Sequence, residues 1–298
     1  MTIIRDLTTS QAEFQECEAH DLLVDNNLFV GIEIEIEDST AFDFNPWWHT
    51  VNEDSIEGYE IVLRNPLQGS QLVEALQMLD PFEFSQNAFN PRTSVHVHLN
   101  IQDMTVPQLC NFIILYLVFE SVLYEYIEEH RRFNHFCLPL SQNYSTIDRL
   151  QGIFRNTNPE AFMSSFRSAF PQQTSKYAGL NLAAVRQYGS LEFRMHQGTS
   201  SSSDIIKWVN ILSRLKAYAM NDDQLPETLI NTKCTQGELT FFYNVFQDEA
   251  KHLLCEDLQE KIIKGSRLAT EVVEVADVYH GETANELAEF SNKLRGES

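Results

Sequence analysis

Basic residues are scarce in this sequence. Its 298 residues include 21 lysines and arginines against 43 aspartates and glutamates, which gives a formal net charge of −22 at pH 7. A surface with this excess of negative charge repels nucleic acids and anionic membranes, so we expect neither as a partner. An anionic ligand such as a phosphate would need a local site of metal ions, arginine and backbone amides.

Cysteine is scarce as well. The chain has five cysteines, an odd number, and no C-x-x-C pair, which argues against a disulfide framework or a zinc knuckle. The N-terminus has no basic head followed by an apolar core, so no signal peptide is expected. The longest apolar segment, residues 109–123, carries Asn111, Glu120 and Ser121 and is too short and too polar to span a membrane. We therefore predict a soluble, cytoplasmic protein.

Internal repeats and low-complexity tracts are absent from the sequence too, and its composition is that of a globular protein. After Asn221 the chain becomes charge-rich with helical patterning at residues 237–264 and 281–295. We predict a lead-in at 1–27 with a short helix within 10–23, a main domain at 28–221, and a C-terminal helical appendage at 222–298. The acidic helices of the appendage are expected to be solvated or to form a homo-oligomer contact.

The clearest pattern that is present is an alternation of isoleucine and glutamate over residues 32–37. A period of two predicts a β-strand whose isoleucines face a core, while Glu33, Glu35 and Glu37 face the other way. Carboxylates two residues apart on a strand lie roughly 6.7 Å from each other and repel by about 2.5 kcal/mol at an effective dielectric constant near 20. This side of the strand is therefore either solvated or balanced by a metal ion or a basic side chain.

Periodicity also predicts the elements that follow the first strand. Thr105 and Gln108 predict a capping box, and the helix after them is apolar almost all round, as in a buried central helix. The serines before residue 204 are expected to cap a helix. Trp47 and Trp48 either line a pocket or pack beneath a loop at residues 38–58. The predicted strands are residues 58–63, 93–101, 177–183 and 190–196, and the predicted helices are residues 69–79, 105 to about 132, and 204–220.

Two of these strands carry histidine, glutamate and arginine at alternate positions. His96 and His98 share one side of their strand, where they are either satisfied surface histidines or part of a metal or phosphate site. Glu192 and Arg194 likewise share a side, with His196 next on it. They form either an ordinary cross-strand ion pair, worth about 0–1 kcal/mol, or a carboxylate ligand beside a guanidinium that holds a phosphate.

Glu60 also lies between apolar neighbours on a predicted strand. Several predicted strands thus carry glutamate or histidine on one side and apolar residues on the other. The sequence predicts an α+β fold: an antiparallel sheet with one acidic, histidine-containing face and helices packed on the other. Oxygen and imidazole ligands without cysteine suit Mg²⁺, or Mn²⁺, better than structural zinc. An arginine beside such a cluster indicates phosphoryl chemistry, in which metals and arginine offset the charge of the transferring group.

Five motifs occur in a fixed order: G-I-E-I-E (31–35), G-Y-E-I (58–61), S-V-H-V-H (94–98), K-Y-x-x-L-N-L (176–182) and G-S-L-E-F-R-x-H-x-G-T (189–199). No single motif is specific, but their order is. Together they resemble the amidoligase family, which belongs to the carboxylate–amine ligases with the glutamine synthetase-like fold and is common in phage and bacterial genomes. The resemblance covers roughly residues 28–215.

This resemblance implies roles for individual residues. Glu33 and Glu35 match ligands of two different divalent metals, and Glu35 and Arg194 are the expected catalytic residues. His98 is expected near the nucleotide phosphates, and Arg194 on the phosphate that is transferred. The residues that match metal ligands are Glu33, Glu35, Glu60, His96 and Glu192.

Three further positions are expected at the phosphates or the substrate. Lys176 and Asn181 fall in a family motif without a defined role, and we expect Lys176 at the phosphates and Asn181 at the substrate. The family pattern offers no equivalent for the fuller set of carboxylates in glutamine synthetase. Asp54 is the candidate for an extra ligand or for a contact to the substrate amine.

The implied activity of a catalytic domain at 28–221 is ATP- and Mg²⁺-dependent amide formation through an acyl phosphate. The partners would be a small-molecule or peptide carboxylate and an amine. One alternative is a metal-dependent hydrolase in which His96, His98 and carboxylates hold ions that activate water. The other is a non-catalytic interaction protein that uses the same sheet. Nucleotide dependence distinguishes the ligase from the hydrolase.

Overall fold

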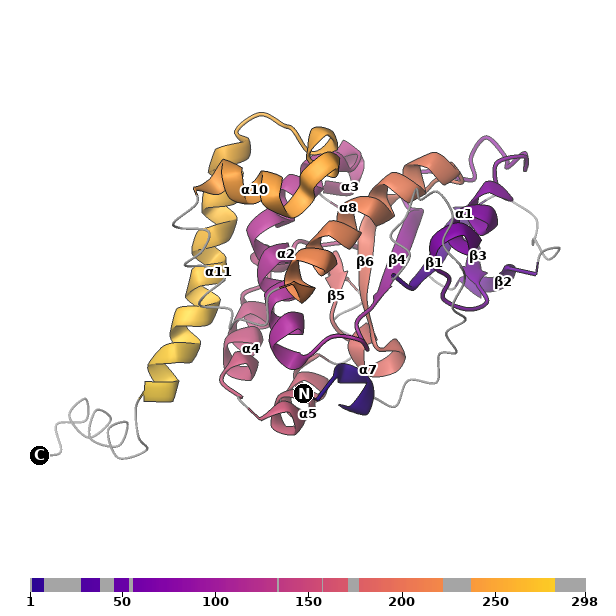
Figure 1. Cartoon of the computed structure of the whole chain (residues 1–298). Helices are drawn as coiled ribbons and strands as arrows, with labels where there is room; N and C mark the ends of the chain where they lie inside the picture. Colours follow the sequence, from indigo (N-terminus) through magenta and orange to yellow (C-terminus); the bar gives the residue numbers. More distant parts are fainter. Residues whose placement is uncertain are drawn as a thin grey trace, which may run out of the picture.

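The computed structural model describes most of the chain (Figure 1). The helix expected within residues 10–23 and the one expected beyond residue 281 lie outside the described residues. The described residues are 2–7, 28–37, 46–53, 56–132, 134–156, 158–170, 177–221 and 237–281, with side chains up to 274.

A six-stranded sheet in the order β2-β3-β1-β4-β6-β5 forms the centre of the fold, and every pairing is antiparallel. The predicted α+β class and antiparallel sheet are confirmed. The glutamate-rich strand lies inside the sheet, paired on both sides. The strands are β1 (Val30–Glu37), β2 (Trp48–Glu53), β3 (Gly58–Leu63), β4 (Ser94–Asn100), β5 (Leu180–Asn181) and β6 (Ser190–Gln197).

Strand β2 was not expected, because residues 38–58 were predicted to be a loop. It pairs with β3, and Trp48 lies opposite Leu63 on the core side of the sheet. Trp48 is fully buried, and its Nε1 donates a hydrogen bond to the Ala75 carbonyl oxygen at 2.8 Å. Of the two roles predicted for the tryptophans, the structure shows packing for Trp48, on a strand instead of beneath a loop.

Strand β5 is shorter than the predicted strand at residues 177–183. Asn181 Oδ1 accepts a hydrogen bond from the Ala183 backbone N–H at 2.9 Å. This local bond turns the chain into helix α7 (Ala184–Tyr188), so the strand ends after two residues.

Helix boundaries follow their caps. The capping box of Thr105 and Gln108 is present, and Ser201 Oγ accepts a hydrogen bond from the Asp204 N–H, so both predicted caps are confirmed. The helices are α1 (Gly69–Gln77), α2 (Val106–Tyr126), α3 (Glu129–Arg132), α4 (Tyr144–Phe154), α5 (Pro159–Ala169), α7, α8 (Ser202–Met220), α10 (Glu238–Phe246) and α11 (Leu258–Gly281), with short 3-10 turns η1 (Ile4–Leu7), η2 (Leu140–Gln142) and η3 (Gln247–His252).

The central helix α2 ends earlier than predicted, at Tyr126 instead of near Arg132. Ile127 has an extended backbone, and the chain resumes as α3. The guanidinium of Arg132 donates to the carbonyl oxygens of Glu125 and Ile127 at 2.8 and 3.2 Å, which satisfies acceptors left free at the helix end.

Helix α2 lies between the sheet and the C-terminal helices (Figure 1). Its Tyr116 ring lies 5.8 Å from the Phe193 ring of β6, and its Phe119 ring stacks 5.6 Å from the Phe241 ring of α10. Among the described helices it has the length and hydropathy of a membrane span, yet 89% of that window is buried inside the protein. It is the core helix against which the sheet packs on one side and helices α10 and α11 on the other. The domain boundary at 221/222 stays a prediction.

One site expectation is wrong: His196 does not share the face of Glu192 and Arg194. Val95 pairs with His196 and Val97 with Phe193, so β6 has one more residue than β4 between these pairs, a β-bulge. The extra residue turns His196 toward the helices, where its ring lies 5.6 Å from the Trp208 ring. Burial lowers the pKa of His196 to about 4.

We predict that His196→Asn removes a pH dependence of stability. In the unfolded chain histidine titrates near pH 6.5, so His196 stabilises the fold above that pH and this contribution is lost as pH falls toward 4. The full effect is roughly 3 kcal/mol, from about 1.36 kcal/mol for each unit of pKa shift. Asparagine keeps an N–H for the Gln197 carbonyl but does not titrate. Urea unfolding between pH 4 and 7 should show the two stability curves converging as pH falls, and parallel curves would contradict the assignment.

A second prediction tests the packing of α11 on α2. A Cβ at Gly265 would lie 2.2 Å from the Val118 carbonyl oxygen, so Gly265→Ala must push the helices apart. We expect a loss of about 1–3 kcal/mol in the free energy of unfolding. The matched control is Gly152→Ala in α4, where no atom lies within 4 Å of the new Cβ. It should gain up to about 1 kcal/mol from helix propensity. If Gly265→Ala and Gly152→Ala changed the melting temperature equally, the close approach of α11 to α2 at Gly265 would be refuted.

Candidate active site

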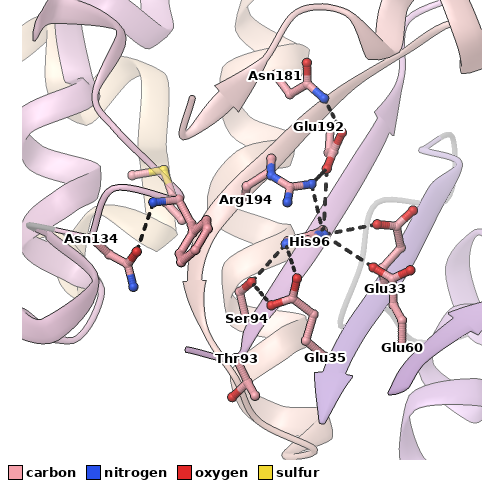
Figure 2. Close-up of polar contacts among 12 residues, drawn as sticks. Glu33, Glu35, Glu60, Thr93, Ser94, His96, Asn134, Asn181, Glu192 and Arg194 are labelled. Atoms are coloured by element: carbon pink, nitrogen blue, oxygen red, sulfur yellow. Dashed lines mark hydrogen bonds and ion pairs between the residues drawn. The ribbon is translucent and has the colours of Figure 1, made fainter. Parts of the chain in front are cut away.

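The strand register gathers the predicted acidic and histidine side chains on one face (Figure 2). Residues directly opposite each other on neighbouring antiparallel strands point to the same side of a sheet. The alternating polar side chains of β3, β1, β4 and β6 therefore form one cluster, on the face of the sheet opposite α2. The opposed pairs are Glu33 with His96, Glu35 with Glu60, and His98 with Glu192.

His96 lies at the centre of the cluster and is 1% exposed. Its Nδ1 is 3.1 Å from Glu33 Oε2, 3.7 Å from Glu192 Oε1 and 3.8 Å from Glu60 Oε1. Its Nε2 is 3.5 Å from Glu35 Oε1. An imidazole has at most two N–H donors, so His96 cannot satisfy four carboxylates. The remaining carboxylates therefore need other donors or cations.

Two groups of side chains have the spacing of metal ligands. One is Glu33, His96 and Glu192, the other is Glu35, Glu60 and His96, and within each group one ligand atom per residue lies within 4.8 Å of the others. Carboxylate and imidazole donors suit Mg²⁺ or Mn²⁺. Glu33 and Glu35 thus fall in different groups, while their roles as ligands stay predictions.

Arg194 provides the positive charge beside these groups. Its Nη1 contacts Glu192 Oε1 and lies 3.3 Å from His96 Nδ1. Burial opposes the charge on both partners, but each is held charged by the other. The pKa of Glu192 is lowered, chiefly by Arg194, and the pKa of Arg194 is raised, chiefly by Glu192. The side chain of Arg194 is still 20% exposed, so it can also contact a ligand.

His98 forms a second charged pair, with Glu33. Its Nε2 lies 3.1 Å from Glu33 Oε1. Burial alone would lower the pKa of His98, but the carboxylates of Glu33 and Glu192 raise it. Burial alone would raise the pKa of Glu33, but His98 and His96 hold it well below its ordinary value. Each partner therefore favours the charged form of the other.

Three neighbours of the cluster were not singled out from the sequence. Ser94 Oγ donates to Glu35 Oε2 at 2.5 Å, and Ser190 Oγ lies 3.1 Å from His98 Nδ1. Both serines follow the same alternation as the histidines and glutamates, a signal that was available. Tyr188, whose ring lies edge-on 5.4 Å from the His98 ring, comes from α7 and had no such signal.

The remaining predicted residues fall in different places. Asn181 is buried, and its Nδ2 donates to Glu192 Oε2 at 2.7 Å, so it holds a carboxylate of the cluster. Glu37 lies apart, accepting from Asn90 Nδ2 at 2.7 Å and pairing with Arg92 at 3.4 Å. Asp54 and Lys176 lie outside the described residues.

Comparison with known proteins gives one family. A family model described as "Putative amidoligase enzyme" matches residues 49–216, more than half of the chain. A search of curated proteins found no match. The matched segment begins after β1, so Glu33 and Glu35 join the site through the pairing of β1 with β3 and β4. The segment contains His96, Glu192 and Arg194, and the chain therefore belongs to this amidoligase family.

Proposed function

We propose that this protein is an ATP- and Mg²⁺-dependent amidoligase that joins a small-molecule or peptide carboxylate to an amine. The carboxylate oxygen takes the γ-phosphoryl group of ATP, giving an acyl phosphate and ADP. The amine then attacks the acyl carbon, the bond to phosphate breaks, and an amide, inorganic phosphate and a proton are released. Family membership supports ligation, and the arrangement of charges supports the metal and nucleotide.

The observation that carries this proposal is the crowding of four carboxylates around His96. Carboxylates roughly 6.7 Å apart repel by about 2.5 kcal/mol per pair at an effective dielectric constant near 20. Divalent ions would offset this repulsion. The two ligand groups share His96, whose neutral ring could ligate only one ion at a time, so a second ion would rely on the carboxylates. When bound, Mg²⁺ supplies charge that shields phosphate oxygens.

The side chains around the ligand groups would position the reacting molecules. Arg194 has guanidinium N–H groups beside the ligands, as required to hold the phosphoryl group during transfer. His98, whose charged form Glu33 favours, would donate to phosphate oxygens. Ser94 and Asn181 fix the carboxylates of Glu35 and Glu192 by hydrogen bonds. Glu35 would accept the proton that the attacking amine releases.

We predict that Glu35→Gln abolishes the Mg²⁺-dependent rise in melting temperature without lowering stability in EDTA. Glutamine retains an oxygen to accept the Ser94 hydroxyl and removes one of the clustered negative charges. Ligand at about 100 times its dissociation constant should add roughly 2.7 kcal/mol to the wild type. Glu37→Gln is the matched control on the same strand, because Glu37 lies outside the cluster. A Glu35→Gln protein that still responds to Mg²⁺ would remove Glu35 from the metal site.

We predict that Arg194→Ala keeps the Mg²⁺ response but loses the additional rise caused by a non-hydrolysable ATP analogue. Turnover should fall about a hundredfold or more, the usual effect of removing a preorganised donor. Arg92→Ala is the control, since Arg92 is an exposed arginine paired with Glu37. Measurement is by thermal melting and ADP release. A wild type that responds to metal but not to nucleotide would support the hydrolase instead, and one that responds to neither would indicate an interaction protein.

A further inference from the structure

Arg131 of α3 is an arginine that the proposed function does not use, and it is 1% exposed. Its Nη2 donates to the Arg194 carbonyl oxygen at 2.9 Å, and its Nε points to the Met195 carbonyl oxygen at 3.4 Å. Arg194 and Met195 are the residues that the β6 bulge places between the pairs Val97–Phe193 and Val95–His196. One guanidinium thus spans both carbonyls of the bulge.

The bulge needs partners from outside the ladder. An extra residue in one strand interrupts the pairing with the neighbouring strand, and buried backbone groups left without a partner are costly. The Arg194 N–H donates to the Gly179 carbonyl oxygen at 2.8 Å, and its carbonyl accepts from Arg131. Both polar groups of the Arg194 backbone are therefore held by residues outside β4.

None of the ion pairs among the described residues includes Arg131, and within the same part of the chain its Nη1 has no hydrogen-bond partner. Burial of a charge without an opposite charge is expensive, so stability alone is a poor reason for an arginine here. The geometry of its hydrogen bonds is a better reason for an arginine at this position. The planar guanidinium directs two N–H groups at adjacent carbonyls, which the single ammonium of lysine cannot reproduce.

We propose that Arg131 is a positioning residue that acts through Arg194. By fixing the two bulge carbonyls, it sets the backbone from which the Arg194 side chain reaches Glu192 and His96. Arg131 does not contact the reacting groups. The inference rests on the proposed function in one respect, namely that Arg194 binds a phosphate of the nucleotide.

The experiment compares Arg131→Lys with Arg132→Lys. Arg132 is the next residue of α3, but its guanidinium contacts Glu125 and the Ile127 carbonyl. Hydrogen exchange of the metal-free proteins should show faster exchange of the Arg194–Gln197 amides in Arg131→Lys only. Thermal melting with Mg²⁺, and with Mg²⁺ plus a non-hydrolysable ATP analogue, should then show an unchanged metal response and an apparent nucleotide affinity weakened about tenfold or more.

A double mutant separates positioning from general destabilisation. If Arg131 acts through Arg194, Arg131→Lys combined with Arg194→Ala should release ADP no more slowly than Arg194→Ala alone, whose residual turnover leaves room for a further loss. Additive losses would overturn the inference, and so would an Arg131→Lys protein that melts lower but keeps the full nucleotide response. A wild type and an Arg132→Lys control without any nucleotide response would instead overturn the proposed function.

Discussion

The convergence of four carboxylates on one buried imidazole is the constraint on which the rest of the structure depends. His96 cannot donate to all of Glu33, Glu35, Glu60 and Glu192, so these carboxylates depend on further partners such as His98 and Arg194. The strands that carry these side chains are held together by apolar burial. This burial lies on the opposite face of the same strands, where the isoleucines of β1 and the valines of β4 are fully buried.

This arrangement explains why strand register matters more here than any single contact. Because side chains alternate with a period of two, a slip of one residue would move Glu33 and Glu35 into the core and the isoleucines onto the acidic face. The isoleucines therefore do two things at once: they form the core, and they fix which side chains meet His96. Trp48 adds to this, since its hydrogen bond to Ala75 ties the edge strand β2 to α1.

Alternation was enough to predict β1, β3, β4 and β6, and with them the six side chains that the register brings together. It was not enough where tertiary contacts override the local pattern. Strand β2 depends on pairing with β3 and on the buried Trp48, and neither is visible in a short polar segment. The direction of His196 depends on a bulge that no periodicity reveals. Tyr188 lies beside His98 from α7, and Arg131 contacts the β6 backbone from α3, so their places follow from the packing of helices against the sheet.

The regular strands of the sheet were predicted correctly by alternation, whereas the side-chain directions of β6 were not, because β6 contains a bulge. The regular strands β1 and β3 supply three of the four carboxylates, Glu33, Glu35 and Glu60, because a regular ladder is the simplest way to align like side chains. The irregular strand β6 supplies the fourth carboxylate and the arginine. Its bulge turns His196 into the core while Arg194 stays within reach of Glu192 and His96. A regular ladder would place Arg194 by the pairing of β6 with β4 alone. The bulge places it instead by bonds to Gly179 and Arg131, so the Arg194 backbone is held from outside β4 while its guanidinium contacts Glu192 of the same strand.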